Sequence, residues 1–217
     1  MKRIRIFEWG DQKWVPAIFR RYFHDLLQHQ VELIYFPIIS TLIHWLKKNQ
    51  IDELTDMASG SGGPWCKLLP LVEKEIPDLF LQLSDLHPRK SCSIFYLGQS
   101  TDLTKPETWP PGAICVFTAF HHLSQEQAEQ LLSTVAKQKR PIFIAEFTER
   151  SYSSILGMLF SPIVVWLDSR KLKPMTLWRF FFTYLVPIIP FMYWWDGTVS
   201  HLSSFTYNEL NLSLIHI

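Results

Sequence analysis

The chain has 217 residues, of which 47% are hydrophobic, and its formal net charge is +1. This length suits one core domain with an insertion, and the Lys and Arg residues form no long basic stripe, which argues against nucleic acid as a partner. The three cysteines, Cys66, Cys92 and Cys115, have no metal-ligand spacing. We therefore expect small core residues of a reducing, cytoplasmic compartment, with no metal site and no secretory signal.

Residues 1–50 are expected to form a helical cap outside the core sheet. Residues 8–16, which include Asp11 and Trp14, have the composition of a loop that leads into a helix. A second helix is predicted from about Pro37 to Lys48, because the apolar residues of that stretch fall near one face.

Residues 55–65 (TDMASGSGGPW) place a carboxylate, a tight glycine turn and a helix start in sequence. Gly60 and Gly62 can adopt positive φ and allow a ligand to approach the backbone, while Pro64 suits the first position of a helix. This pattern predicts a nucleotide-type ligand over the turn. A dinucleotide fingerprint needs a small residue where Trp65 stands, so a nicotinamide cofactor is disfavoured.

Four further strands are predicted, and polar residues follow their carboxyl ends. The strands cover residues 78–83, 93–97, 113–118 and 141–147. Apolar runs that alternate with helical segments predict an α/β fold with a Rossmann-like, doubly wound, mostly parallel sheet. Ligands of such sheets bind beyond the carboxyl ends of the strands, where we expect one cleft to collect Asp56, Asp85, Asp102 and His121.

The order of these motifs resembles that of class I S-adenosylmethionine-dependent methyltransferases over about residues 50–150. In that family an acidic residue ends the first strand, and glycines follow four and six positions later, places that Asp56, Gly60 and Gly62 hold. The family usually has glycine at Ala58 as well, so this turn is expected to be more restricted in φ and ψ. The resemblance implies S-adenosylmethionine as cofactor and methyl transfer as the reaction.

The same resemblance implies a role for each loop. Asp56 would orient the methionine portion of the cofactor, Asp85 would hold the ribose hydroxyls and Asp102 would contact the adenine. Asp11 and Trp14 are expected lid residues, because the family's N-terminal segment often lies over the cofactor; surface packing is the alternative. The full set of expected cofactor contacts is Asp56, Ala58, Ser59, Gly60, Gly62, Asp85, Leu86, Asp102, Thr118 and Phe120.

His121 and His122 follow the predicted strand at 113–118, as paired histidines do in some small-molecule methyltransferases. Imidazole titrates near neutral pH, so either side chain is a candidate base that removes a proton from a hydroxyl, an amine or a carbon acid. The alternative is that one histidine only packs in the loop, because methyl transfer can proceed by positioning alone.

The segment from 151 to 195 is unusually apolar. Residues 151–167 and 180–195 carry no charge, and a basic stretch with Arg170, Lys171 and Lys173 separates them. Both runs are shorter than the ~20 residues that cross a bilayer as a helix. Three interpretations stay open: helices lying in a membrane interface at the inner face, a hydrophobic substrate-binding lid, or a dimer surface. The first two suggest a small hydrophobic or lipid-like acceptor.

We therefore expect a cap (1–50), a cofactor-binding core (51–150), an apolar helical insertion (151–200) and a C-terminal segment (201–217) without the family's final strand pair. Residues 212–217 (LSLIHI) match the translation of a sequencing-adapter end, so we expect the native chain to continue differently past 211; a short terminal strand is the alternative. Two rival functions stay open, a nicotinamide-dependent oxidoreductase and a non-catalytic membrane-associated protein on the same fold.

Overall fold

The computed structural model describes residues 1–87 and 94–210 and divides the chain into two compact units. The sheet unit comprises Val31–Phe147 with Tyr207–Ile217, and the helical unit comprises Met1–Gln30 with Thr148–Thr206. The division differs from the expected one at residue 50. Leu42 and Leu46 of α2 (Ile39–Lys48) are fully buried in the core of the sheet unit, because the apolar face of this helix covers the sheet. Residues 212–217, for which an adapter-derived end or a short strand was expected, lie outside the described residues.

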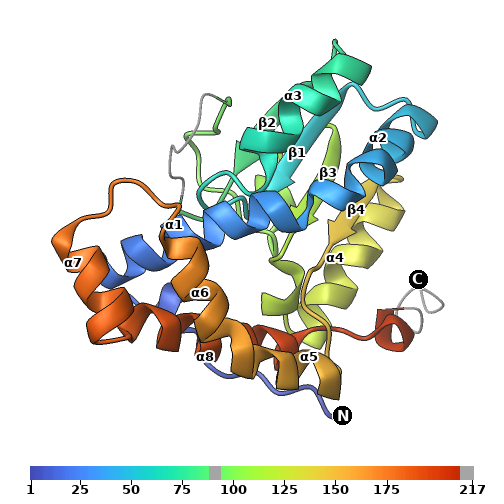
Figure 1. Ribbon diagram of the computed structural model, residues 1–217. Helices are drawn as coiled ribbons and strands as arrows, with labels where there is room; N and C mark the ends of the chain where they lie inside the picture. The colour runs from blue at the N-terminus through green and yellow to red at the C-terminus, as the bar shows by residue number, and fades with distance from the viewer. Residues whose placement is uncertain (88–93, 211–217) are drawn as a thin grey trace. The chain divides into compact units, whose positions relative to one another are not determined.

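The sheet has four parallel strands in the order β2-β1-β3-β4 (Figure 1). They are β1 (Glu53–Met57), β2 (Phe80–Ser84), β3 (Ala113–Phe117) and β4 (Ile142–Ala145). The register places Asp56 opposite Leu83 on one side and Cys115 on the other. All five residues of β3 are buried, as a parallel strand covered on both faces requires. The predicted α/β, Rossmann-like fold class is confirmed.

The predicted strand at 93–97 is reduced to a single parallel bridge between Tyr96 and Leu83, at the free edge of β2. Leu83 accepts from Leu97 N at 2.8 Å, and its own amide donates to Phe95 O at 2.9 Å. Pairing stops there because the chain turns back, so that the amide of Thr101 can reach Asp85 O at 3.0 Å. Ser93 lies outside the described residues.

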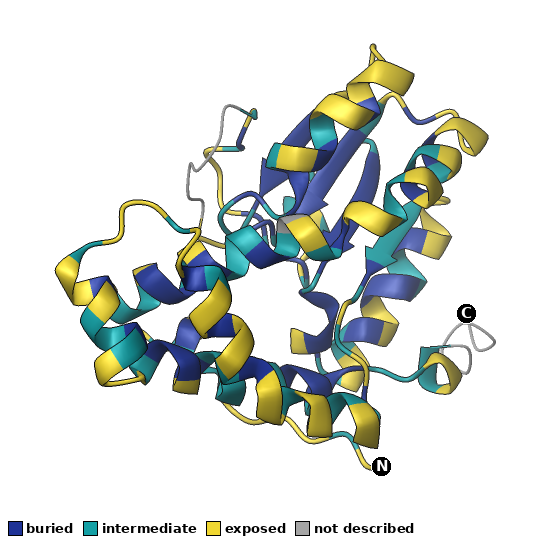
Figure 2. Cartoon of the chain, viewed as in Figure 1, coloured by how far each residue is buried: buried dark blue, intermediate teal, exposed yellow. Residues whose placement is uncertain are grey.

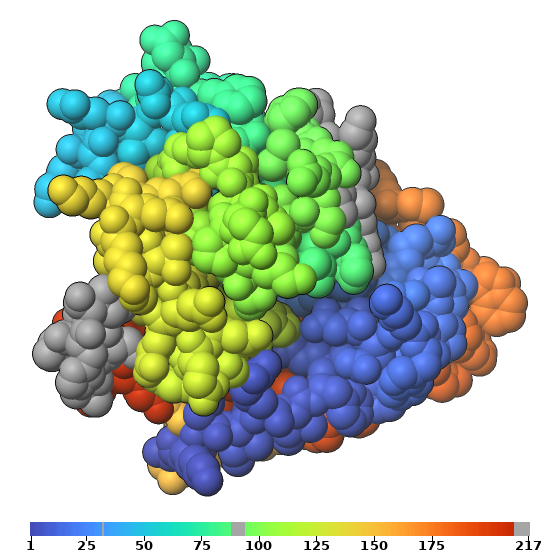
Figure 3. Space-filling model, turned by 180° about the vertical axis from the view of Figure 1, so that it is seen from behind, coloured from blue at the N-terminus to red at the C-terminus, as the bar shows by residue number. Residues whose placement is uncertain are grey.

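Helices cover both faces of the sheet, which makes it doubly wound. One face packs against α2 (Ile39–Lys48) and α3 (Trp65–Glu75), whose buried residues join Ala113, Cys115 and Phe117 in one core. Since strand residues alternate between faces, Ile114 and Val116 point to the opposite face. There α4 (Gln125–Lys137) buries its apolar stripe, and Figures 1 and 3 show it on the side away from α2 and α3. The short helices of this unit are η2 (Phe36–Ile38), η3 (Pro106–Thr108) and η4 (Phe120–His122).

The helical unit joins the start of the chain to the segment after β4. Its core contains Tyr22, Phe23 and Leu26 from α1 together with Val165 and Met192 from the later segment. Its elements are η1 (Trp9–Asp11), α1 (Ala17–Ile34, which continues into the sheet unit), α5 (Tyr152–Gly157), η5 (Met158–Phe160), α6 (Ser161–Ser169), α7 (Leu177–Phe180), the π-helix η6 (Phe181–Leu185) and α8 (Ile188–Ser203).

Two polar contacts hold these distant segments of the helical unit together. Asp196 of α8 accepts the backbone amides of Trp9 at 2.7 Å and Gly10 at 2.8 Å. Burial raises the pKa of Asp196 to about 7, although these two amides oppose the rise. Arg179 is buried, pairs with Asp25 and lies over an aromatic ring of α1. The first 30 residues are therefore anchored to the segment after residue 147.

Candidate functional site

The glycine turn closes directly over the carboxyl ends of β1 and β2. Ser59 N donates to Ser84 O at 2.9 Å, and the amides of Gly62 and Gly63 both donate to Ser59 O, at 2.8 and 3.0 Å. Pro64 is the N-cap of α3 rather than its first helical residue. The amides of Gly62 and Gly63 are therefore used within the turn.

The turn is built on four residues with positive φ, namely Ala58 (60°), Gly60 (55°), Gly62 (112°) and Gly63 (53°). An alanine in this region costs about 1–2 kcal/mol relative to an ordinary conformation, so Ala58 is a strained position. The expectation that alanine restricts this turn fits that conformation. At Gly60 an added Cβ would meet no atom within 4 Å, which leaves open space beside its backbone.

Asp85 fixes the backbone of Gly60 beside this open space. Its Oδ2 accepts the amide of Gly60 at 2.9 Å, and its Oδ1 accepts the amide of His87 at 2.7 Å. The hydroxyl of Tyr96 donates to Gly60 O at 3.1 Å from the other side. Each carboxylate oxygen has a second lone pair, so Asp85 can still accept hydroxyl groups of a ligand. Leu86, 50% exposed, follows Asp85. The role of Tyr96 was missed, because only the bridge to β2 places it here.

Asp56 lies beneath the turn and is fully buried. Its Oδ1 is 3.7 Å from Cys115 Sγ, and its Oδ2 would lie 3.2 Å from a Cβ on Gly63. Oδ2 has no hydrogen-bond partner among the residues that the structure describes. Burial raises the pKa of Asp56 to about 7, although the side chains of Ser59, Cys115 and Trp65 oppose the rise. The alternation along β1 sends this side chain to the face that α3 covers, so it does not line the open space at Gly60.

Asp102 follows Thr101, whose amide donates to Asp85 O at 3.0 Å, but the carboxylate of Asp102 serves its own turn. Oδ1 accepts the amide of Thr104 at 2.9 Å and the hydroxyl of Thr104 at 2.7 Å, and Oδ2 is 3.6 Å from Lys105 Nζ. Burial by itself raises the pKa of Asp102, but the hydrogen bonds from Thr104 and the charge of Lys105 together outweigh it. The pKa of Asp102 is therefore lowered. This geometry gives the residue a structural part in the turn.

His121 and Glu146 form a pair beyond the ends of β3 and β4. His121 is 1% exposed, and its Nδ1 lies 2.8 Å from Glu146 Oε2. Glu146 Oε1 also accepts the amide of Phe120 at 2.6 Å, which fixes the carboxylate against η4. His122 is exposed, with its ring 4.3 Å from that of His121. A neutral imidazole that donates through Nδ1 presents Nε2 as an acceptor, so Glu146 can orient His121 as a base.

Tyr35 connects the loops of this edge. Its hydroxyl lies 2.5 Å from Thr118 Oγ1 and donates to Ala145 O at 2.9 Å. Burial raises the pKa of Tyr35 well above its ordinary value, and the negative charges of Glu146 and Asp56 contribute to the rise. Sequence reasoning missed both Tyr35 and Glu146. The signal for Glu146 was its place directly after the apolar run of β4, whereas Tyr35 gave none.

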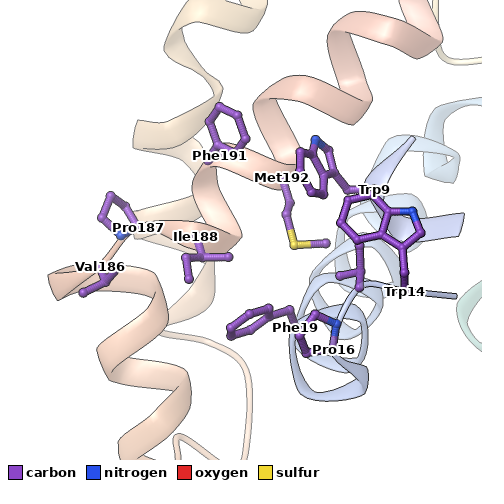
Figure 4. A pocket seen from close by; sticks show the side chains of 10 residues that line it. Trp9, Trp14, Pro16, Phe19, Val186, Pro187, Ile188, Phe191 and Met192 are labelled. Atoms are coloured by element: carbon purple, nitrogen blue, oxygen red, sulfur yellow. The ribbon is translucent and has the colours of Figure 1, made fainter. Parts of the chain in front are cut away.

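The two expected lid residues belong to the helical unit, where Trp14 borders an apolar cavity of about 370 Å³ (Figure 4). Trp14 is 64% exposed, and Asp11 lies in η1 without lining the cavity. Every lining side chain is apolar or aromatic. The lining residues are Trp9, Trp14, Val15, Pro16, Phe19, Val186, Pro187, Ile188, Phe191 and Met192.

Substituting Asp56→Asn is expected to flatten the dependence of stability on pH. Burial raises the folded-state pKa of Asp56 from 3.8 to about 7, so the folded protein keeps a proton that the unfolded chain has released. The stability contributed by this group is therefore full below about pH 4 and is lost as the pH rises through about 7. Asparagine does not ionise, so the variant should gain roughly 1–4 kcal/mol on the wild type over this range.

Urea unfolding of both proteins between about pH 4.5 and about pH 8 measures this difference. Any cost of the new amide group is the same at every pH and does not affect the slope. The exposed Asp78→Asn is the matched control and should follow the wild type. Parallel profiles for the wild type and Asp56→Asn would contradict the buried carboxylate described above.

No protein-family model matches the sequence, and no curated protein does so either. Among solved structures, the chain is similar to the plantazolicin methyltransferase BpumL in complex with SAH, with 15% identity, a TM-score of 0.53 and coverage of 96% of this chain and 71% of that chain. It is also similar to BpumL in complex with a monoazolic desmethylPZN analog and SAH, with 11% identity, a TM-score of 0.53 and coverage of 91% and 68%. The chain therefore has the fold of class I S-adenosylmethionine-dependent methyltransferases.

Proposed function

We propose that this protein binds S-adenosylmethionine at the carboxyl edge of its sheet and transfers the methyl group to a small hydrophobic or lipid-like acceptor. The observation that carries the proposal is the Gly60 position, held between Asp85 and Tyr96 with open space beside its backbone. It lies at the edge where open α/β sheets bind their ligands. The fold shared with BpumL, which was solved with SAH, supports the same cofactor class.

The residues around Gly60 fit an adenosyl group. Asp85 has the acceptor capacity for two ribose hydroxyls, and the missing side chain at Gly60 lets a ligand approach the backbone. Exposed Leu86 offers an apolar surface next to them. Asp56 is buried beneath the turn, beside Cys115, and supports the turn from there. The carboxylate of Asp102, the proposed contact of the adenine, already accepts a hydrogen bond within its own turn. We therefore assign most of the binding energy to Asp85 and the glycine turn.

When bound, S-adenosylmethionine supplies an electrophilic methyl group on a sulfonium. On transfer, the acceptor atom would form a bond to that carbon as the carbon–sulfur bond broke, and the electron pair would stay on sulfur. An acceptor that carries a proton must also lose it. His121, oriented by Glu146 at 2.8 Å, is the proposed base that takes this proton, and exposed His122 is the less constrained alternative.

The cavity of the helical unit supports a hydrophobic acceptor. Its volume of about 370 Å³ lies at the small end of ligand pockets, and its walls include the aromatic side chains of Trp9, Phe19 and Phe191. Water makes few hydrogen bonds in such a space, so an apolar group gains by entering it. We propose that this cavity binds a small hydrophobic compound, the class to which we assign the acceptor.

A nicotinamide-dependent oxidoreductase fits less well. Trp65 stands where a dinucleotide site needs a small residue, and its indole is fully buried in the core beside Phe117, with the ring centroids 5.6 Å apart. A side chain of this size separates α3 from the sheet by more than a glycine would.

Substituting Asp85→Ala is expected to weaken binding of S-adenosylhomocysteine by about 5- to 150-fold, because two hydroxyl acceptors and the support of Gly60 are lost together. Titration calorimetry measures the dissociation constant. Asp85→Asn keeps one acceptor oxygen, so its dissociation constant should lie between those of the wild type and Asp85→Ala. Asp52 is exposed before the amino end of β1, so Asp52→Ala should bind as the wild type does. Binding of NAD in preference to S-adenosylhomocysteine would reject the proposed cofactor.

Substituting His121→Ala is expected to lower methyl transfer by about 10²- to 10⁴-fold, the usual range for loss of a general base. Labelled S-adenosylmethionine incubated with an organic-solvent extract of hydrophobic metabolites reports the transfer. Glu146→Gln should give a smaller loss and shift the pH profile of the rate, because the imidazole keeps its place without its carboxylate. His122→Ala tests the alternative base, and His44→Ala, exposed on α2, is the control. Undiminished rates in both His121→Ala and His122→Ala would leave positioning as the whole mechanism.

Substituting Ile188→Trp is expected to fill the cavity and weaken binding of the neutral fluorescent probe N-phenyl-1-naphthylamine by at least about tenfold. The affinity for S-adenosylhomocysteine should not change. Val164→Trp adds the same side chain at an exposed site of α6 that does not line the cavity, and it should bind the probe normally. Equal probe binding by both variants would show that the cavity is not the apolar site.

A further inference from the structure

A contiguous helix of the helical unit carries an exposed apolar stripe, which we call the apolar face. The helix runs through α5, η5 and α6, from Tyr152 to Ser169. The face consists of Tyr152 (79% exposed), Leu156 (64%), Leu159 (58%), Phe160 (65%), Ile163 (51%) and Leu167 (55%). Their spacing of three and four residues places them on one side of the helix, and Figure 2 shows α5 and α6 largely exposed along that side.

The opposite side of the same helix is packed. Ser161, Val165 and Ser169 are buried at intervals of four residues, where α6 lies against α8. The exposed stripe is therefore not a helix that has failed to pack. It is the outer side of a docked helix, and exposed apolar surfaces of this extent mark interaction sites.

Basic residues stand at both ends of the apolar face. Arg170 and Lys173 are exposed just beyond its carboxyl end, while Lys171 pairs with Asp168 at 2.8 Å. At the other end, buried Arg150 donates to Met1 O at 2.8 Å and so brings the amino terminus, with exposed Lys2, beside the start of α5, where exposed Glu149 is the one acidic neighbour in the sequence. Asp168 is the single acidic residue of the sequence between 151 and 195.

We propose that the apolar face docks onto an anionic lipid bilayer, with the helix lying in the plane of the membrane interface. Apolar side chains between two basic ends match the hydrocarbon boundary between anionic head groups. Leu177 (80% exposed) and Trp178 (58%) are further exposed apolar side chains that follow the basic stretch in the sequence, and tryptophan suits the interface. This proposal is independent of the proposed methyl transfer.

A transmembrane orientation fits this helix less well. By length and composition, Tyr152–Ser169 (mean hydropathy 1.3, 17% buried) meets the criterion for a spanning helix, and the stretch Ala17–Lys48 (1.2, 24% buried) meets it too. The helix Tyr152–Ser169 has 18 residues and so extends past the end of the uncharged run 151–167, which was judged too short to cross a bilayer. However, its buried side packs against α8, which holds the buried polar side chains of Asp196 and Ser200. Spanning would carry those groups toward hydrocarbon, whereas an in-plane position leaves them in the protein.

Flotation of the full chain with vesicles tests the proposal. Vesicles of phosphatidylcholine with phosphatidylglycerol should bind it at least about tenfold more tightly than phosphatidylcholine alone, and ~0.5 M salt should remove most of the difference. The double variant Leu156→Ser/Phe160→Ser should lose binding by at least about tenfold. Its matched control is Leu33→Ser/Phe36→Ser in the sheet unit, where the two side chains are 55% and 56% exposed.

A second pair of variants tests the charges. Arg170→Glu/Lys173→Glu should abolish the preference for anionic vesicles, while Lys67→Glu/Lys74→Glu, an equal charge change on α3, should not. Absence from all vesicle fractions would overturn the proposal. A chain that instead forms a dimer which Leu156→Ser/Phe160→Ser dissociates would overturn it in favour of a protein interface. Resistance to extraction at alkaline pH would overturn it in favour of a spanning helix.

Discussion

The hydrogen bond from the Gly60 amide to Asp85 Oδ2 is the interaction on which the candidate site depends. It joins the loop after β1 to the loop after β2, strands that already pair in parallel register. A backbone with positive φ is held by few contacts of its own, so a turn with four such residues needs an external anchor. Asp85 supplies one, and the bond from Ser59 N to Ser84 O supplies another. The open space beside Gly60 is a consequence of this anchoring.

Strand alternation then decides what each acidic residue of this edge can do. Asp56 is inside β1, where its side chain must point to one face of the sheet, and that face is covered by α3. Asp85 follows the last residue of β2, where the pleat no longer fixes its direction, and its carboxylate reaches the turn. Two carboxylates from neighbouring strands therefore differ in exposure, and burial raises the pKa of Asp56 to about 7. The buried one lies beneath the turn, and the other reaches the turn beside Gly60.

The sequence predicted those parts of the fold that depend on local pattern. The apolar runs of β3 and β4 identify buried parallel strands, and the glycines at 60 and 62 identify the turn. The strand at 93–97 was overestimated because its length along the chain does not reveal how far it can pair with β2. The role of Tyr35 could not be predicted, because it contacts a residue 110 positions away. The place of Glu146 after β4 indicated the edge of the sheet, but not its pairing with His121, 25 positions away. Such pairings follow from topology rather than from spacing.

The cavity and the apolar face belong to the same unit, and that unit exists because the first 30 residues pack with the segment after β4. Asp196, by accepting the amides of Trp9 and Gly10, fixes one wall of the cavity to α8, and α8 also carries the inner side of α6. A hydrophobic acceptor concentrates in lipid rather than in water. If the apolar face holds this unit at a bilayer, the cavity is therefore placed where the local concentration of such an acceptor is highest. Membrane docking would then lower the apparent KM without any new contact to the acceptor, because it acts on local concentration rather than on intrinsic affinity.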